Sequence, residues 1–158
     1  MPMGWTSENV SKDFNVSRQR MDQLAAISHQ RAGKAQAEGK FDTEIVPMVA
    51  YQYPATPAAT GAARPARVEV IVNRDDGIRA DSTAEGLSKI RAAFPQWGNG
   101  TTTGGNASQI TDGVASVLLM KRSKAEELGL AIIGNQVQTR VVGLAPRIMG
   151  VVSIVARI

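Results

Sequence analysis

Two apolar segments separated by a short helical one most strongly constrain the fold of this chain. Residues 110–120 hold an almost continuous apolar run, which suits a strand covered on both faces, as in α/β sheets. Ser123 is positioned to cap a short helix that Gly129 closes, and residues 132–142 form a second strand candidate. The order strand, helix, strand predicts a right-handed crossover in an α/β sheet.

The first 40 residues favour two helices. The hydroxyl pair Thr6–Ser7 followed by Glu8 is typical of a helix start, because a hydroxyl accepts from a free backbone N–H and the carboxylate complements the helix dipole. This helix is expected to reach about Phe14. Ser17 is positioned to cap a second helix, and Gly39 ends it as the residue after the C-cap. Its packed face is predicted from residues at helical spacing, namely Met21, Leu24, Ala25, Ser28, Ala32 and Ala35.

The next segments alternate between extended chain and loop. Residues 41–49 are extended in character, and Pro47 argues against a central strand there. Residues 51–65 are rich in Pro and Ala, as expected of a surface loop or insertion. The alternation in Val68–Asn73 predicts a strand whose valines share one face.

A turn and a capped helix follow this strand. Asp75 and Asp76 precede Gly77, a composition that turns the chain and explains the acidic residues there without paired carboxylate chemistry. Ser82 and Glu85 have the spacing of a capping box, which predicts a helix that starts at Ser82. The helix is expected to bury Leu87 and Ile90 and to stop near Phe94-Pro95, because the residue before proline disfavours helical backbone.

A loop of Gly, Thr, Asn and Ser at residues 98–108 is the richest source of backbone donors and hydroxyls in the chain. Such a loop can hold phosphate through its N–H groups, with Arg79 or Arg91 as charged partners. However, neither GxxxxGK[ST] nor GxGxxG is present. A tight, buried loop that joins a helix to a strand is the simpler interpretation of the same residues.

The composition excludes several kinds of chemistry. The chain of 158 residues has no cysteine, so it has no disulfide, thiolate metal site or cysteine nucleophile. Its one histidine, His29, is too little for a histidine metal site and is interpreted as an exposed or locally hydrogen-bonded side chain. No apolar run reaches the roughly 18 residues of a membrane span, and the N-terminus shows no recognisable targeting signal. The net charge of +4 is scattered, which favours a solvated surface over nucleic-acid binding.

Seven stretches in unbroken order resemble the 3-ketoacyl-CoA thiolases of the peroxisomal fatty-acid type. They cover most of the chain, which makes them far more specific than any isolated motif. The stretches are MGWTSENVSKDFNVSRQRMDQLAAISHQRA at Met3–Ala32, FDTEIVP at Phe41–Pro47, DDGIR at Asp75–Arg79, EGLSKIRAAF at Glu85–Phe94, GNASQITDG at Gly105–Gly113, RSKAEELGL at Arg122–Leu130 and VVGLAPRIMG at Val141–Gly150.

The resemblance implies an internal piece of a longer α/β enzyme whose two similar halves each contribute a sheet. Residues 1–113 are expected to correspond to the inserted, largely helical loop domain, with a Pro/Ala-rich insertion near residues 51–67. Residues 114–150 would supply the strand-helix-strand end of the N-terminal half, as part of a mixed sheet. Residues 151–158 depart from the family pattern and are expected to form an atypical tail.

The resemblance also implies where coenzyme A would lie. In the family, the arginine of the DDGIR segment lies by the adenine, which puts Arg79 there, and the serine of the GNAS motif lies along the pantetheine arm, which puts Ser108 there. Asn106 and Ala107 would flank the same channel. The family usually reads TAGNAS where this chain has TGGNAS, so Gly104 adds a backbone entropy cost of up to roughly 1 kcal/mol.

Activity and location are expected from the resemblance as well. The family transfers acyl groups between 3-ketoacyl-CoA and coenzyme A in peroxisomal fatty-acid β-oxidation, with acyl-CoA as substrate and no covalently bound cofactor. Because the family's thiolate nucleophile is missing, this chain is expected to be inactive by itself. No catalytic residue and no metal ligand are assigned. The alternative is a non-catalytic module that forms homo-oligomers or associates with intact thiolase subunits.

Overall fold

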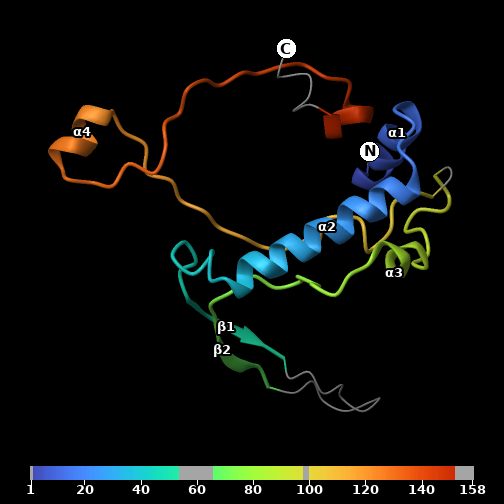
Figure 1. Cartoon of the computed structure of the whole chain (residues 1–158), viewed down its shortest axis with the longest axis horizontal. Helices are drawn as coiled ribbons and strands as arrows, with labels where there is room; N and C mark the ends of the chain where they lie inside the picture. The colour runs from blue at the N-terminus through green and yellow to red at the C-terminus, as the bar shows by residue number, and fades with distance from the viewer. Residues whose placement is uncertain (1, 54–65, 98–99, 152–158) are drawn as a thin grey trace. The chain divides into compact units, whose positions relative to one another are not determined.

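The computed structural model describes residues 2–53, 66–97 and 100–151 (Figure 1). The chain divides into two compact units, Met1–Met21 with Ile90–Ile158, and Asp22–Lys89. Much of the predicted insertion and the tail after residue 151 lie outside the described residues. The elements are α1 (Met3–Asp13), α2 (Arg18–Ala37), β1 (Met48–Gln52), β2 (Val68–Val72), α3 (Ala84–Ser88), α4 (Arg122–Glu127) and the 3-10 segment η1 (Pro146–Val151).

Helix α1 starts earlier than the hydroxyl pattern predicts. Its N-cap is Pro2, with φ −64°, and no side chain caps the helix. Proline suits this position because it has no N–H for the helix start to leave unpaired, and its extended backbone, with ψ 147°, is typical of an N-cap. The Pro2 carbonyl accepts from the Trp5 N–H at 3.1 Å. Glu8 therefore lies in the middle of α1, and the prediction that it complements the helix dipole is wrong.

Helix α2 has the predicted ends, and its packed face agrees with the prediction only in part: Met21, Ala25, Ala32 and Ala35 are half-buried. The Ser17 hydroxyl accepts from the Arg20 N–H at 3.3 Å, which confirms the cap. At the other end Gly39 has φ 67° and the Lys40 N–H reaches the Ala35 carbonyl at 3.0 Å, the arrangement that glycine permits after a helix. Leu24 is 68% exposed, so the predicted face is wrong at that position. Ser28 is also exposed, and the buried residues of α2 are Asp22 and Ala26.

The second unit contains an antiparallel pair, β1 with β2, in which Ala50 faces Val70. The predicted strand at residue 68 is confirmed. Strand β1 begins directly after Pro47, because proline cannot donate to a ladder, and it takes up the first residues of the predicted loop. The cross-strand partners Tyr51 and Glu69 are joined by a hydrogen bond of 3.1 Å from the phenol to the carboxylate.

Helix α3 is capped one residue later than predicted and is shorter. Thr83, not Ser82, is the N-cap, and its hydroxyl accepts from the Gly86 N–H at 3.0 Å. Ser82 instead closes a turn, since its N–H donates to the Arg79 carbonyl at 3.0 Å. Leu87 is buried as expected, whereas Ile90 lies beyond the helix and is 37% exposed.

The two apolar segments around α4 do not form strands in the described part of the chain. Figure 1 shows α4 between two long extended stretches of the first unit. Val114 is 98% exposed and Val137 is 92% exposed. An extended segment becomes a strand only when a neighbour satisfies its N–H and carbonyl groups. Because these stretches have no such neighbour among residues 2–53, 66–97 and 100–151, the predicted crossover is not formed.

Helix α4 is present where the sequence predicts a short helix, with a different cap. Lys121 is the N-cap and Ser123 lies inside the helix, so the prediction that Ser123 caps it is wrong. Gly129 has φ 65° and the Leu130 N–H donates to the Ala125 carbonyl at 2.9 Å. The glycine therefore closes the helix as predicted.

Candidate functional site

The loop from Gly100 to Ser108, here called the Gly/Thr loop, is held at its base by backbone contacts within the first unit. Thr103 forms an isolated antiparallel bridge with Ala92, and the Ala93 N–H donates to the Thr102 carbonyl at 2.9 Å. This bridge explains why the helix predicted to reach residue 94 ends at Ser88: residues 92 and 93 pair with the loop instead. Gly100 has φ 61°, and a Cβ there would lie 2.7 Å from the Ala92 Cβ, so the turn requires glycine.

The carboxylate of Glu8 ties the Gly/Thr loop to α1. One oxygen, Oε1, accepts from the Thr102 N–H at 2.7 Å. The other, Oε2, accepts from the Thr101 N–H at 3.1 Å and from the Thr101 hydroxyl at 3.0 Å. Glu8 is 5% exposed, which means that these bonds form away from most of the solvent.

Two opposing effects act on the pKa of Glu8. Burial raises the pKa, because it disfavours the charged form. The hydrogen bonds from Thr102 and Thr101 together outweigh burial, because they are made to the ionised carboxylate, and they hold the pKa below its ordinary value. Glu8 is therefore a buried anion whose partners are donors of the Gly/Thr loop.

Hydroxyl groups extend the contact on both sides of Glu8. The hydroxyls of Ser7 and Thr102 are 2.8 Å apart. The Thr101 hydroxyl also lies 2.9 Å from the Ser11 oxygen, and Ser11 donates to the Val16 carbonyl at 2.9 Å. One face of α1 thus presents three polar side chains in succession to two consecutive residues of the loop.

The Asn106 side chain forms hydrogen bonds with the backbone of two other residues of the Gly/Thr loop. Its Oδ1 accepts from the Thr103 N–H at 2.8 Å, and its Nδ2 donates to the Thr101 carbonyl at 3.0 Å. Thr103 is fully buried, and its hydroxyl accepts from the N–H groups of Gly105 and Asn106 at 3.2 Å each. The side chain of Asn106 therefore fixes the turn on which it was predicted to flank a ligand.

Ala107 and Ser108 follow this turn and are exposed. The Ala107 N–H donates to the Thr103 carbonyl at 3.1 Å. The Ser108 hydroxyl donates to the Gln109 carbonyl at 3.2 Å. The structure thus brings three of the four predicted site residues, Asn106, Ala107 and Ser108, together at the end of one braced loop.

Arg79, the fourth predicted residue, belongs to the other compact unit. Its backbone N–H donates to His29 Nδ1 at 3.3 Å, and the residue is exposed. The turn before it forms as predicted: Gly77 has φ 83°, and its N–H donates to the Asp76 carboxylate at 2.6 Å. His29 is a hydrogen-bond acceptor for this segment, in agreement with its non-catalytic interpretation.

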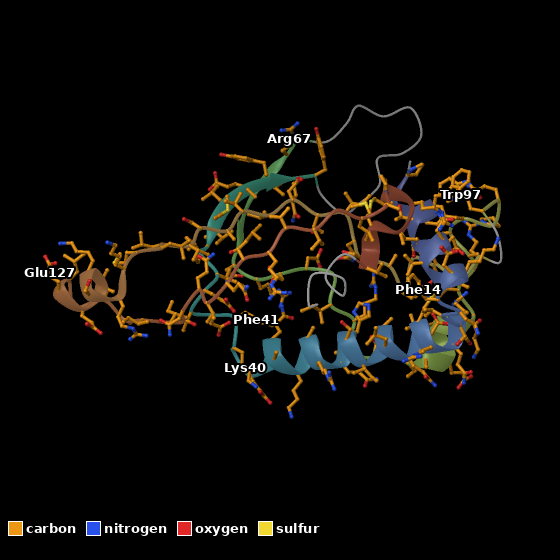
Figure 2. The ribbon with its side chains drawn as sticks, turned by 90° about the horizontal axis from the view of Figure 1, so that it is seen from above. Phe14, Lys40, Phe41, Arg67, Trp97 and Glu127 are labelled. Carbon is orange, nitrogen blue, oxygen red and sulfur yellow. The ribbon has the colours of Figure 1, made fainter. Side chains whose placement is uncertain are left out.

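Three aromatic residues accompany α1 in the first unit. The Trp97 ring stacks on Trp5 with centroids 5.3 Å apart and on Phe94 with centroids 4.8 Å apart. Figure 2 shows Trp97 beside α1. A Cβ at Gly4 would come within 2.2 Å of the Phe94 ring, so this glycine lets the ring approach the helix. The cluster fixes the segment that leads into the Gly/Thr loop.

A cavity of about 240 Å³ opens on the same unit, mostly lined by apolar atoms. It is lined by Met3, Thr6, Ser7, Val10, Ser11, Val16, Met21 and Gly150. The described residues contain no group of three or more His, Cys, Asp or Glu side chains suited to a metal ion. Within the same ranges no helix is both long and apolar enough to cross a membrane.

The role of Glu8 and of its hydroxyl neighbours was not predicted from the sequence. A glutamate beside Thr6–Ser7 is typical of a helix start. This local pattern explains the presence of Glu8 without any contact to a distant loop. The signal that pointed elsewhere is the Gly/Thr loop itself, whose many backbone donors require acceptors if the loop is buried. The identity of the acceptor, more than 90 residues away in sequence, depends on the tertiary fold.

The chain belongs to the thiolase family: residues 1–123 match the family described as Thiolase, N-terminal domain. Over 151 residues it is 45% identical to the human protein named 3-ketoacyl-CoA thiolase, peroxisomal, and 48% identical to 3-ketoacyl-CoA thiolase B, peroxisomal, of Candida tropicalis. These alignments cover 96% of this chain and 33% and 34% of the relatives. The chain therefore spans about a third of the length of these relatives.

Experimental structures show the same relationship. The dimeric peroxisomal thiolase of Saccharomyces cerevisiae matches with a TM-score of 0.76 at 44% identity, over 96% of this chain and 34% of that one. The Bacillus anthracis acetyl-CoA acetyltransferase matches with a TM-score of 0.73 at 35% identity, again over 96% and 34%. The predicted thiolase-like, mixed α/β fold class is confirmed.

Proposed function

We propose that this chain is one part of a 3-ketoacyl-CoA thiolase and that its Gly/Thr loop forms one wall of a coenzyme A site. The observation that carries the proposal is the loop itself: a carboxylate, several hydroxyls and an amide hold it in one shape, and it ends at the exposed Ser108. The names of the relatives, 3-ketoacyl-CoA thiolase and acetyl-CoA acetyltransferase, support coenzyme A thioesters as the ligand class.

Each site residue has a role that suits its chemistry. The Arg79 guanidinium can stack on the adenine and meet phosphate through paired N–H donors. The Ser108 hydroxyl can donate to or accept from an amide of the pantetheine arm. Ala107 leaves room beside that arm, and Asn106 sets the turn that presents both residues.

We also propose that the reaction itself requires parts outside this chain. Acyl transfer to coenzyme A through a covalent intermediate needs a nucleophile and a base that activates it. The chain has no cysteine, and the only histidine accepts a hydrogen bond from Arg79. The purified chain is therefore expected to show no thiolytic turnover with a 3-ketoacyl-CoA, and turnover by the pure protein would refute this part of the proposal.

Calorimetry with coenzyme A tests the binding role. Binding is expected in the wild-type chain, with weaker binding in Arg79→Ala and Ser108→Ala because each removes one ligand contact. Arg74→Ala is the matched control, since it removes an exposed arginine near the same turn that has no assigned role. Absence of heat in the wild type, or equal affinity in all variants, would refute retained coenzyme A binding.

The segment boundaries and location are part of the same proposal. Residues 1–113 correspond to the thiolase loop domain and residues 114–150 to the end of the N-terminal half. The relatives from human and Candida tropicalis are named peroxisomal, which supports a peroxisomal location for the protein that contains this chain. The yeast relative is named dimeric, which supports a homo-oligomer.

A second candidate function is association with an intact thiolase chain, and the extended apolar segments favour it. The side chains of Ile110 and Ile133 in these segments are fully exposed. Exposed apolar β-branched segments with unpaired backbone groups invite pairing with another chain. Light scattering of the chain with and without a thiolase subunit distinguishes the two functions, because a monomer indifferent to its homologue would refute association.

A further inference from the structure

We propose that Glu8 is the positioning residue of the Gly/Thr loop, so that α1 controls whether the loop can present Ser108 to a ligand. The link to coenzyme A rests on the proposed function, whereas the control of the loop by Glu8 does not. The proposal starts from how directly the carboxylate engages the loop. One carboxylate oxygen accepts from the Thr101 N–H and the other from the Thr102 N–H, and these two residues are consecutive in the loop.

The loop's internal bonds depend on the same two residues. Asn106 Nδ2 donates to the carbonyl of Thr101, and the carbonyl of Thr102 accepts from the Ala93 N–H at 2.9 Å. A shift of the Thr101–Thr102 backbone would therefore disturb the Asn106 turn as well as the bridge at the base. Ala107 and Ser108 come directly after this turn, which makes their position a consequence of the Glu8 contact.

Neighbouring groups cannot replace Glu8 as the acceptor. Within the described loop, Ser7 and Ser11 contact the hydroxyls of Thr102 and Thr101, and neither serine accepts from a loop N–H group. A buried N–H without a partner is costly, and bonds to an ionised acceptor are stronger than neutral ones. Loss of the carboxylate is therefore expected to release the loop locally, before α1 unfolds.

Amide hydrogen exchange of the full chain tests the positioning role without any ligand. In Glu8→Ala, the amides of Thr101, Thr102, Thr103 and Ala107 should exchange at least about tenfold faster than in the wild type. The exchange rates of the Phe14 amide, at the end of α1, and of the Ala125 amide, within α4, should not change. Glu126→Gln is the matched control, because it neutralises an exposed glutamate of the same unit.

Glu8→Gln is a milder variant that separates the two oxygens of the carboxylate. Its amide oxygen can still accept from the Thr102 N–H, whereas its amide nitrogen cannot accept from the Thr101 N–H. Protection is therefore expected to survive at Thr102 and to fall at Thr101. If position 8 only needed a side chain of this size and not a carboxylate, the amides of both Thr101 and Thr102 would stay protected in Glu8→Gln.

Coenzyme A titration of the same variants tests the link to the proposed function. Affinity should fall about tenfold in Glu8→Ala and less in Glu8→Gln, with Glu126→Gln equal to the wild type. Unchanged loop exchange in Glu8→Ala, or a uniform increase that includes Phe14, would overturn the positioning role. Faster loop exchange with unchanged affinity would overturn control of the ligand by α1. No binding by the wild type would refute the proposed coenzyme A site, while the exchange result would still decide the role of Glu8 in the loop.

Discussion

At the scale of single residues, Glu8 shows how one buried charge organises a distant loop. It is 5% exposed, and donors from Thr101 and Thr102 satisfy both of its oxygens. A buried carboxylate with matched donors stays ionised, and its removal leaves those donors unpaired. The loop then loses its charged contact with α1 and keeps only the hydroxyl contacts of Ser7 and Ser11.

The lowered pKa of Glu8 predicts a stability loss in acid. Because the pKa is lower in the folded state than in the unfolded chain, the unfolded state binds a proton first as the pH falls. The contribution is fully present above the ordinary glutamate pKa of about 4.3 and is lost as the pH falls through the folded value. Unfolding free energies measured across this range should decline less steeply in Glu8→Gln than in the wild type.

The pKa of Asp13 is also lowered, by its hydrogen bond from Arg147, so it contributes to acid sensitivity in the same direction. The difference between the wild type and Glu8→Gln isolates the part due to Glu8, because Asp13 is unchanged in both. Equal pH slopes for the two proteins would contradict a depressed Glu8 pKa.

Gly104 offers a stabilising substitution. Its φ is outside the left-handed region, and a Cβ placed there would meet nothing within 4 Å. Gly104→Ala should therefore stabilise the chain by about 0.4–1 kcal/mol, because alanine reduces the entropy of the unfolded chain. Chemical denaturation measures the effect.

Gly100→Ala is the opposite case at the start of the same loop. Gly100 has φ 61°, and its Cβ would lie 2.7 Å from that of Ala92, so this variant should lose stability. If both alanine variants changed stability in the same direction, Gly100 and Gly104 would not differ in backbone conformation in this way.

At the scale of elements, helix starts were predicted where hydroxyls lie, and the structure chose among them by their neighbours. Ser17 caps α2 as predicted. Ser82 does not cap α3, because its N–H closes a turn with Arg79, and Thr83 takes the position. At α1, Pro2 leads the helix and no hydroxyl is required. Local sequence identified the helices, but the turn or proline that precedes each helix decided its first residue.

The α3 cap gives a prediction that distinguishes the contribution of Thr83 to stability from that of Ser82. Thr83→Ala should destabilise the second unit by about 1 kcal/mol, since it removes the acceptor for the Gly86 N–H. Ser82→Ala, the matched control, should have a smaller effect because its turn uses only the backbone. Thermal unfolding of both variants measures this, and a larger loss in Ser82→Ala would support the capping box instead.

Helix α1 and the segment η1 are joined by an ion pair between Asp13 and Arg147. A second Arg147 N–H reaches the other Asp13 oxygen at 3.4 Å, and Asn9 Nδ2 donates to the Arg147 carbonyl at 3.1 Å. Arg147→Ala should therefore raise the exchange of the Ile148 amide, which donates to Ala145, with little effect on α4.

Salt provides an independent control for this contact. Exposed charge pairs weaken as the Debye length falls to about 3 Å near 1 M ionic strength. Added salt should increase Ile148 exchange in the wild type and change it little in Arg147→Ala. If exchange at Ile148 were the same in both proteins at low salt, the ion pair would not be what holds η1 on α1.

At the scale of the whole molecule, the fold class was predictable, but the strand-helix-strand unit expected around α4 is not formed among the described residues. The run at residues 110–120 has the apolar composition of a buried strand, and the family match over residues 1–123 confirms the class. The strands themselves are not formed, since Val114 is almost fully exposed and no ladder reaches it among the described residues. Side-chain pattern is local, whereas strand formation depends on partners, and this chain covers about a third of its relatives.

This mismatch between apolar composition and exposure leads to a test of association. Val117 is 78% exposed and Val137 is 92% exposed, so changing both to Lys removes no packing in the chain itself. The free energy of unfolding should stay within about 0.5 kcal/mol of the wild type, as expected for surface substitutions. Binding to a thiolase subunit, measured by light scattering, should be lost, because pairing would bury both charges.

Ile71→Lys, on β2 and 69% exposed, is the matched control and should bind as the wild type does. If the double variant still associated, the extended segments would not be the interacting surface, and if it unfolded, these side chains would be packed in solution.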